Sequence, residues 1–143
     1  MPYPKNDDII LEGVQDYEET MEFLGGKHWR DISASDLVFN SEYIAYTEPV
    51  GFRFFLPAWL LACIQEDVDT DVLPEEMVWR LTIREPGQSA DLKHARLLML
   101  DSRQRLAVRH VLEYMKEGYP RCNAVDTKDA EAALRSLEDA GYI

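Results

Sequence analysis

The stretch from residue 58 to residue 64 constrains the fold more than any other part of this chain, because every side chain in it is apolar. A helix that is apolar on all sides must be buried on all sides. The run is also far shorter than the ~20 residues that cross a bilayer. Pro57 precedes it and disfavours a helical conformation in the residue before it. We therefore predict a central buried helix over residues 58–65.

The remaining segments predict short helices around this centre. Apolar residues at helical spacing mark a first helix, and Gly25 and Gly26 end it. The residues of this stripe are Ile10, Val14, Tyr17, Met21 and Leu24. The predicted fold is mainly α, a single compact domain over residues 1–143 with five to six short helices. A short polar tail over residues 1–7 and at most a small two-stranded ribbon complete it.

The charge balance restricts the partners of this chain. The 143 residues include 27 acids and 15 bases, which give a net charge of −12. Such a chain is repelled by nucleic acid and by anionic membranes, and it is attracted to a basic partner. No secretory signal is recognisable at the N-terminus, and Cys63 and Cys122 form no C-x-x-C pair. We expect a soluble cytoplasmic protein.

The charge is unevenly distributed along the chain. Acids dominate residues 1–24 and 64–78, whereas residues 84–109 carry six bases and three acids. The bases are Arg84, Lys93, Arg96, Arg103, Arg105 and Arg109. This stretch can pack beside the acidic segments and neutralise them in part, or it can attract the acidic segments of another subunit.

The recognisable catalytic and metal-binding motifs are absent from the sequence. It contains no P-loop, no G-x-G-x-x-G and no G-x-S-x-G. Asp67, Asp69 and Asp71 have the spacing that opens a calcium loop, but Val72 and Val78 stand where Gly and Glu are required. We predict no cofactor, no metal site and no catalytic residues, and a non-enzymatic role is favoured over an enzyme.

Three sequence blocks resemble an uncharacterised bacterial family, a domain of unknown function. They are His28–Ile32 (HWRDI), Gly51–Leu61 (GFRFFLPAWLL), and LDSRQ from Leu100 leading into Gln104–Tyr114, and they span about residues 27–115. The resemblance implies bacterial origin and a soluble helical domain, and it implies no activity. Arg53 is the charged residue among the three Phe of the middle block. It must reach a partner or stack on a ring, as a fold-organising ion pair or as a ligand-binding group.

The leading functional hypothesis is an acidic protein-binding module. One concrete form of it is an immunity- or antitoxin-type protein that blocks a basic partner. The candidate contact residues are Asp67, Asp69, Asp71, Glu75, Glu76, Glu12, Asp16 and Glu19. Two alternatives stay open. One is a small enzyme or ligand-binding domain with a pocket near Arg53, Trp59 and His28, and the other is a structural homo-oligomer joined through complementary acidic and basic faces.

Overall fold

Helix α3 (Pro49–Cys63) lies at the centre of the molecule because most of its side chains are apolar and buried. The computed structural model describes residues 2–5, 8–67, 69–84, 88–120 and 125–143. Before α3 come α1 (Tyr17–Leu24), the 3-10 helix η2 (Trp29–Asp31), α2 (Ala34–Phe39) and the 3-10 helix η3 (Ser41–Tyr46). After it come α4 (Leu73–Leu81), α5 (Gln88–Leu98), α6 (Ser102–Lys116) and α7 (Thr127–Asp139). The predicted mainly α fold class is confirmed.

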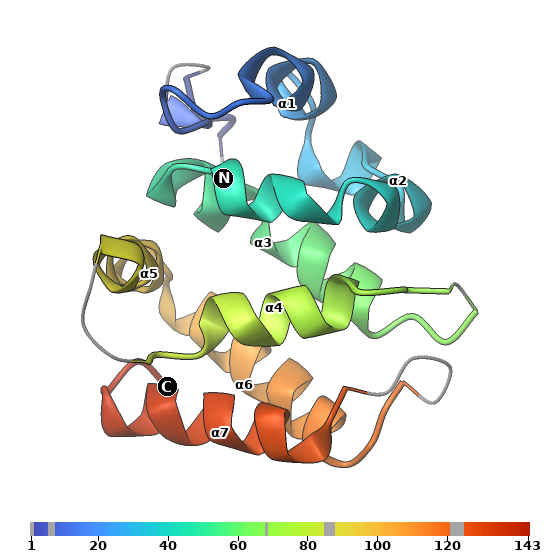
Figure 1. Cartoon of the computed structure of the whole chain (residues 1–143), viewed down its shortest axis with the longest axis vertical. Coiled ribbons are helices and arrows are strands. Elements are labelled where there is room, and N and C mark those ends of the chain that lie inside the picture. The colour runs from blue at the N-terminus through green and yellow to red at the C-terminus, as the bar shows by residue number, and fades with distance from the viewer. Residues whose placement is uncertain (1, 6–7, 68, 85–87, 121–124) are drawn as a thin grey trace.

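The other helices pack around α3 and cover most of it (Figure 1). In that view α1 lies at one end of the molecule and α7 at the other, with α4 crossing in front of α3. Helices α2, α4, α5 and α6 all contact α3, and α6 and α7 pack closely against each other. Trp59 and the three Phe of α3 are almost completely buried. Among the described residues, no helix is both long enough and apolar enough to cross a membrane.

The central helix is longer than predicted, because Pro57 lies inside it and does not break it. Proline has no N–H, so the carbonyl of Arg53, four residues earlier, loses its helical donor. The side-chain amide of Gln104 on α6 replaces that donor and lies 2.9 Å from the Arg53 oxygen. The helix also presents Leu61 outward, with half of its side chain exposed. The prediction that this helix is buried on all sides is therefore wrong at Leu61.

The predicted first helix begins later than its apolar stripe, at Tyr17 instead of near Ile10. Ile9 and Ile10 are buried, but turns and one isolated bridge, and not an α-helix, form the chain around them. Ile10 forms a single antiparallel bridge with Thr47, and no strand is formed within the described ranges. The Ile9 carbonyl accepts a hydrogen bond from the N–H of Glu48 at 2.8 Å. A Cβ at Gly51 would overlap this carbonyl, so glycine allows the segment to lie directly on α3.

The described part of the N-terminal segment contacts the helices. The Tyr3 ring packs edge-on against Phe54, and its hydroxyl accepts a hydrogen bond from the N–H of Gly26 at 2.6 Å. Residues 1, 6 and 7 of the predicted tail, together with Cys122, lie outside the described residues. Cys63 is buried, and this burial raises the pKa of its thiol.

The family-like blocks meet around α3. His28 of the first block packs edge-on against Phe54 of the middle block. Arg53 lies 3.8 Å from the carboxylate of Asp101 in the third block. Asp101 and Gln104 also form a reciprocal capping box at the start of α6. The three blocks therefore bring η2, α3 and α6 into contact. The ion pair of Arg53 with Asp101 agrees with the fold-organising interpretation of Arg53.

Candidate interaction surfaces

The structure divides the eight predicted carboxylates into three groups. Asp67, Asp69 and Asp71 lie exposed in the loop between α3 and α4. Glu75 and Glu76 lie in the first turn of α4 and face a different hollow. The third group belongs to α1 and the turn before it, at the end of the molecule farthest from α7 (Figure 1). The acidic residues between 66 and 76 are close in the sequence, but they therefore do not form one continuous surface.

The third group consists of Glu12, Asp16 and Glu19. Asp16 is the N-cap residue directly before α1, and its carbonyl accepts a hydrogen bond from the hydroxyl of Thr20 at 2.6 Å. Burial raises the pKa of Tyr43 on η3, and the nearby carboxylates, Asp16 and Glu19 among them, raise it further. These two acids therefore lie close to η3, whereas Glu12 is exposed in the turn before α1.

The three loop aspartates lie beside an exposed aromatic side chain. They line an open hollow of about 640 Å³ together with Ser35, Val38, Phe39 and Ser41. Phe39, at the end of α2, is 85% exposed, which makes it the most exposed large apolar side chain in the described chain. None of the described residues that line this hollow is basic. We call Val38, Phe39, Asp67, Asp69 and Asp71 the Phe39 surface.

Local bonds hold the aspartate loop in place. The carboxylate of Asp69 accepts a hydrogen bond from the N–H of Asp71 at 3.0 Å. Asp71 adopts a positive φ of 45°, a conformation that Asp tolerates better than most residues. Thr70 between them is fully buried, and its carbonyl accepts a hydrogen bond from the N–H of Leu73 at 3.0 Å. The loop is thus anchored at Thr70 while the carboxylates on either side face solvent.

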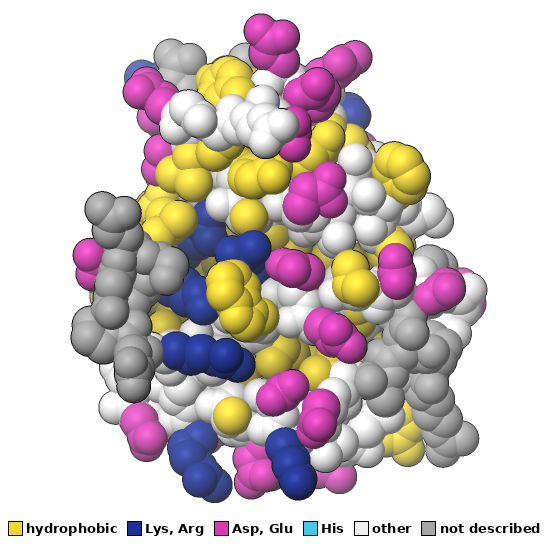
Figure 2. Space-filling view, in the orientation of Figure 1, with side chains coloured by type: hydrophobic (Ala, Val, Ile, Leu, Met, Phe, Trp, Pro, Cys, Tyr) yellow, Lys and Arg dark blue, Asp and Glu magenta, His cyan; other side chains and the backbone are white. Residues whose placement is uncertain are grey.

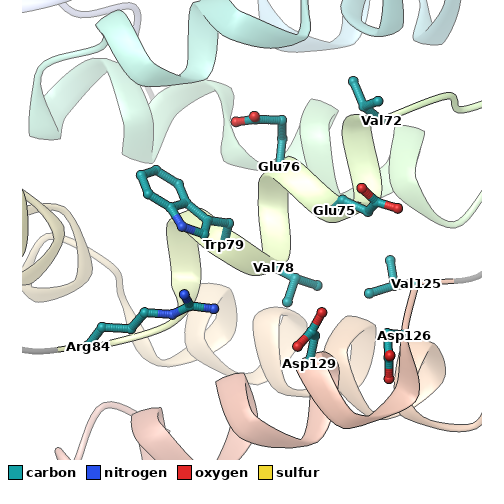
Figure 3. A pocket seen from close by; sticks show the side chains of 9 residues that line it. All are labelled: Val72, Glu75, Glu76, Val78, Trp79, Arg84, Val125, Asp126 and Asp129. Carbon is teal, nitrogen blue, oxygen red and sulfur yellow. The ribbon is translucent and has the colours of Figure 1, made fainter.

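A second hollow, of about 480 Å³, lies between α4 and the start of α7 (Figure 3). We call it the α4–α7 groove. Apolar side chains form part of it, and Trp79 beside them is 41% exposed. The lining residues are Val72, Glu75, Glu76, Val78, Trp79, Arg84, Val125, Asp126 and Asp129. Sequence reasoning missed Trp79, Asp126 and Asp129, because nothing in the sequence indicates that the starts of α4 and α7 lie side by side.

Basic side chains surround Trp79. The guanidinium carbon of Arg80 lies 4.3 Å from the centre of the indole ring, and the amine nitrogen of Lys93 on α5 lies 4.2 Å from the same point. Lys93 is only 7% exposed and donates to the carbonyls of Trp79 and Thr82. Burial lowers the pKa of Lys93, and the neighbouring charges lower it further. Those charges belong to Arg80, Arg84 and Arg96.

Arg96 on α5 is buried in the same region and is 3% exposed. Its guanidinium donates to the carbonyls of Ala45 and Thr47 at the end of η3. Burial lowers the pKa of Arg96 to about 10, with Arg80 adding to the shift and Glu48 opposing it. Two bases of the predicted basic stretch, Lys93 and Arg96, therefore hydrogen-bond to backbone carbonyls.

The structure gives separate structural contacts to His28, Arg53 and Trp59. Trp59 is fully buried and packs against Phe52 and Phe55. A hollow of about 390 Å³ between η2, α2 and α3 is lined by sequence neighbours of His28 and Trp59. Its lining residues are Trp29, Arg30, Ile32, Ala34, Ala58, Leu61, Ala62 and Gln65. His28, Arg53 and Trp59 line neither this hollow nor the two described above.

The described residues form no cluster of metal ligands. Within the described ranges, no group of three or more His, Cys, Asp and Glu residues is arranged to hold a metal ion. The calcium-like spacing of Asp67, Asp69 and Asp71 therefore does not produce a ligand cluster in the described part of the loop.

The comparisons with known proteins identify a family. No curated protein and no solved structure matches this chain significantly. A family model does match, over residues 12–136, and that span includes all three sequence blocks that meet around α3. The chain belongs to this family, the family of unknown function DUF6714.

Proposed function

We propose that this protein is a binding module for a basic protein, which it contacts through the Phe39 surface. One observation carries the proposal: Phe39 is 85% exposed beside three exposed aspartates, in a hollow with no Lys or Arg among its described lining residues. A contiguous apolar patch with a polar rim marks an interaction site. Val38 extends the apolar area of Phe39 in this hollow, and the three aspartates with Ser35 and Ser41 form its polar rim.

The chemistry of the surface favours a cationic partner. An aromatic side chain is a typical anchor of protein interfaces, because it buries a large area with little loss of side-chain freedom. The surrounding carboxylates complement Lys and Arg side chains, and the net charge of −12 would accelerate the encounter with a basic protein. An immunity- or antitoxin-type protein is one form of this function, in which carboxylates occupy the positions of nucleic-acid phosphates on a basic effector.

The experiment begins with capture of a partner from host lysate at low salt and elution with a salt gradient. The affinity of the captured protein is then measured by calorimetry for wild type and variants. We expect Phe39→Ser, and separately the triple variant Asp67→Asn, Asp69→Asn and Asp71→Asn, to weaken binding at least about tenfold, or 1.4 kcal/mol.

A matched control separates local contact from net charge. The triple variant Glu18→Gln, Glu22→Gln and Asp139→Asn removes the same number of negative charges at exposed positions away from the Phe39 surface. Its affinity should stay within about twofold of wild type, apart from a slower encounter at low salt. Equal losses in both triple variants, or none in Phe39→Ser, would overturn the assignment of this surface.

A further inference from the structure

The α4–α7 groove differs from the Phe39 surface because it carries opposite charges at its two ends. Figure 3 shows Trp79 and Arg84 at one end, and Glu75, Asp126 and Val125 at the other. Helix α4 runs the length of the groove, so its first turn supplies acids and its C-terminal end supplies bases. Figure 2 shows this face: Lys and Arg side chains gather left of centre, and Asp and Glu side chains lie to their right.

The acidic end is not neutralised within the described chain. Glu75 and Asp129 are exposed, and neither they nor Asp126 takes part in an ion pair among the described residues. Asp126 uses one carboxylate oxygen to cap α7 through the N–H of Lys128. Three carboxylates therefore lie at this end without an ion pair to any Lys or Arg among the described residues.

The basic end holds more cations than the acids near it. Arg80, Arg84, Lys93 and Arg96 influence one another electrostatically. Glu76 contacts Arg80 at 3.4 Å, and Glu48 acts on Arg96. Four cations and two anions leave a positive excess among the described groups. Arg84 is exposed in this region and lines the groove.

A surface with this pattern is complementary to itself. A two-fold axis in the plane of the interface and perpendicular to α4 brings the acidic end of one groove onto the basic end of the other. The two α4 helices then lie antiparallel, and Trp79 of each copy faces the apolar residues Val72 and Val125 of the other. We propose that the protein forms a symmetric homodimer through the α4–α7 groove.

The net charge predicts an unusual dependence of this dimer on salt. Two chains of −12 repel each other over a long range. The Debye length falls from ~30 Å at about 0.01 M salt to ~8 Å at about 0.15 M and ~3 Å at about 1 M. Intermediate salt therefore screens the long-range repulsion before it screens the close contacts in the groove. Dimerisation should be strongest near physiological salt and weaker at both extremes, whereas binding of a basic partner should weaken steadily as salt rises.

Charge reversal tests the proposed pairing by sedimentation equilibrium of the full chain. The acid-end variant carries Glu75→Lys and Asp129→Lys, and the base-end variant carries Arg84→Glu. Each variant alone places like charges opposite each other and should raise the dimer dissociation constant at least about tenfold. Mixing the two restores opposite charges at both ends, so a heterodimer should form with an affinity near that of wild type.

A control variant changes the net charge equally but elsewhere. Glu18→Lys and Glu22→Lys on α1 add the same four charge units at exposed positions. This variant should dimerise at least as well as wild type, because its net charge is smaller. Circular dichroism is used to check that each variant is folded. A wild type that stays monomeric at all salt concentrations, or two reversal variants that fail to pair when mixed, would overturn the proposal. Neither outcome bears on the Phe39 surface.

Discussion

Gln104 is the residue that lets a proline lie inside the central helix. Its amide nitrogen donates to the Arg53 carbonyl that Pro57 leaves without a helical donor, and its amide oxygen completes the capping box with Asp101. Gln104→Ala should destabilise the protein by about 1–3 kcal/mol, because a part-buried carbonyl loses its donor and α6 loses one bond of its cap. Urea denaturation followed by circular dichroism measures the change.

A double-mutant cycle isolates the contribution of the replaced donor. Pro57→Ala supplies an N–H that can bond to Arg53, so Gln104→Ala should cost about 1 kcal/mol less in that background. Additivity of the two changes to within about 0.3 kcal/mol would mean that Gln104 stabilises only the start of α6. The sequence predicts a break at Pro57 because the effect of a proline on a helix is inferred from the neighbouring residues alone. The compensating donor, Gln104, lies 51 residues from Arg53 in the sequence and carries no local signal.

At the scale of whole elements, α5 closes the ends of two other helices. Lys93 donates to carbonyls at the C-terminal end of α4, and Arg96 donates to carbonyls at the end of η3. Last-turn carbonyls have no partner inside their own helix, and cations are favourable there. Lys93→Met and Arg96→Met should each lower the free energy of unfolding by about 1.5–3 kcal/mol. Arg103→Met, at an exposed position of α6, should stay within about 0.5 kcal/mol.

The elements differ in how much of them the sequence predicted. Helix starts with a side-chain cap carry a local signal in the sequence, as at Ser33, Asp101 and Asp126, because the capping bond joins residues two or three positions apart. The first helix was predicted too long, because the buried Ile10 pairs with Thr47 instead of facing inward from a helix. An extended segment and a helix can bury the same apolar residue, and periodicity over a few residues does not separate the two.

At the scale of the whole molecule, the net charge was known from the sequence but its arrangement was not. Asp67 and Glu75 are close in sequence, yet they line different hollows. Glu75 and Asp129 are far apart in sequence, yet they line the same groove because α4 packs against α7. Helix packing decides which carboxylates lie together. The predicted contact residues therefore include the aspartates of the Phe39 surface and Glu75 and Glu76 of the α4–α7 groove, but not Phe39, Trp79, Asp126 or Asp129.

The same net charge predicts that salt stabilises the fold. The radius of gyration of a chain of this length falls from ~40 Å unfolded to ~15 Å folded, so folding brings like charges together. At about 0.01 M salt the Debye length is ~30 Å, so these charges repel one another across the folded molecule. At about 0.15 M salt it is ~8 Å, and most of this repulsion is screened. The five ion pairs in the described chain are at least partly solvent-exposed, so each loses well under about 1 kcal/mol to the same screening.

Relief of repulsion should therefore outweigh the loss of ion pairs. Raising sodium chloride from about 0.01 M to about 0.15 M should raise the melting temperature by about 2–8 °C, for a gain of about 1–2 kcal/mol. Scanning calorimetry at micromolar protein measures it, and the acid-end variant, which carries a net charge of −8, should show a smaller rise. A melting temperature that falls with salt would mean that local ion pairs, and not the overall charge, dominate the electrostatics of folding. Tetramethylammonium chloride should act like sodium chloride, because screening depends on ionic strength and not on the identity of the cation.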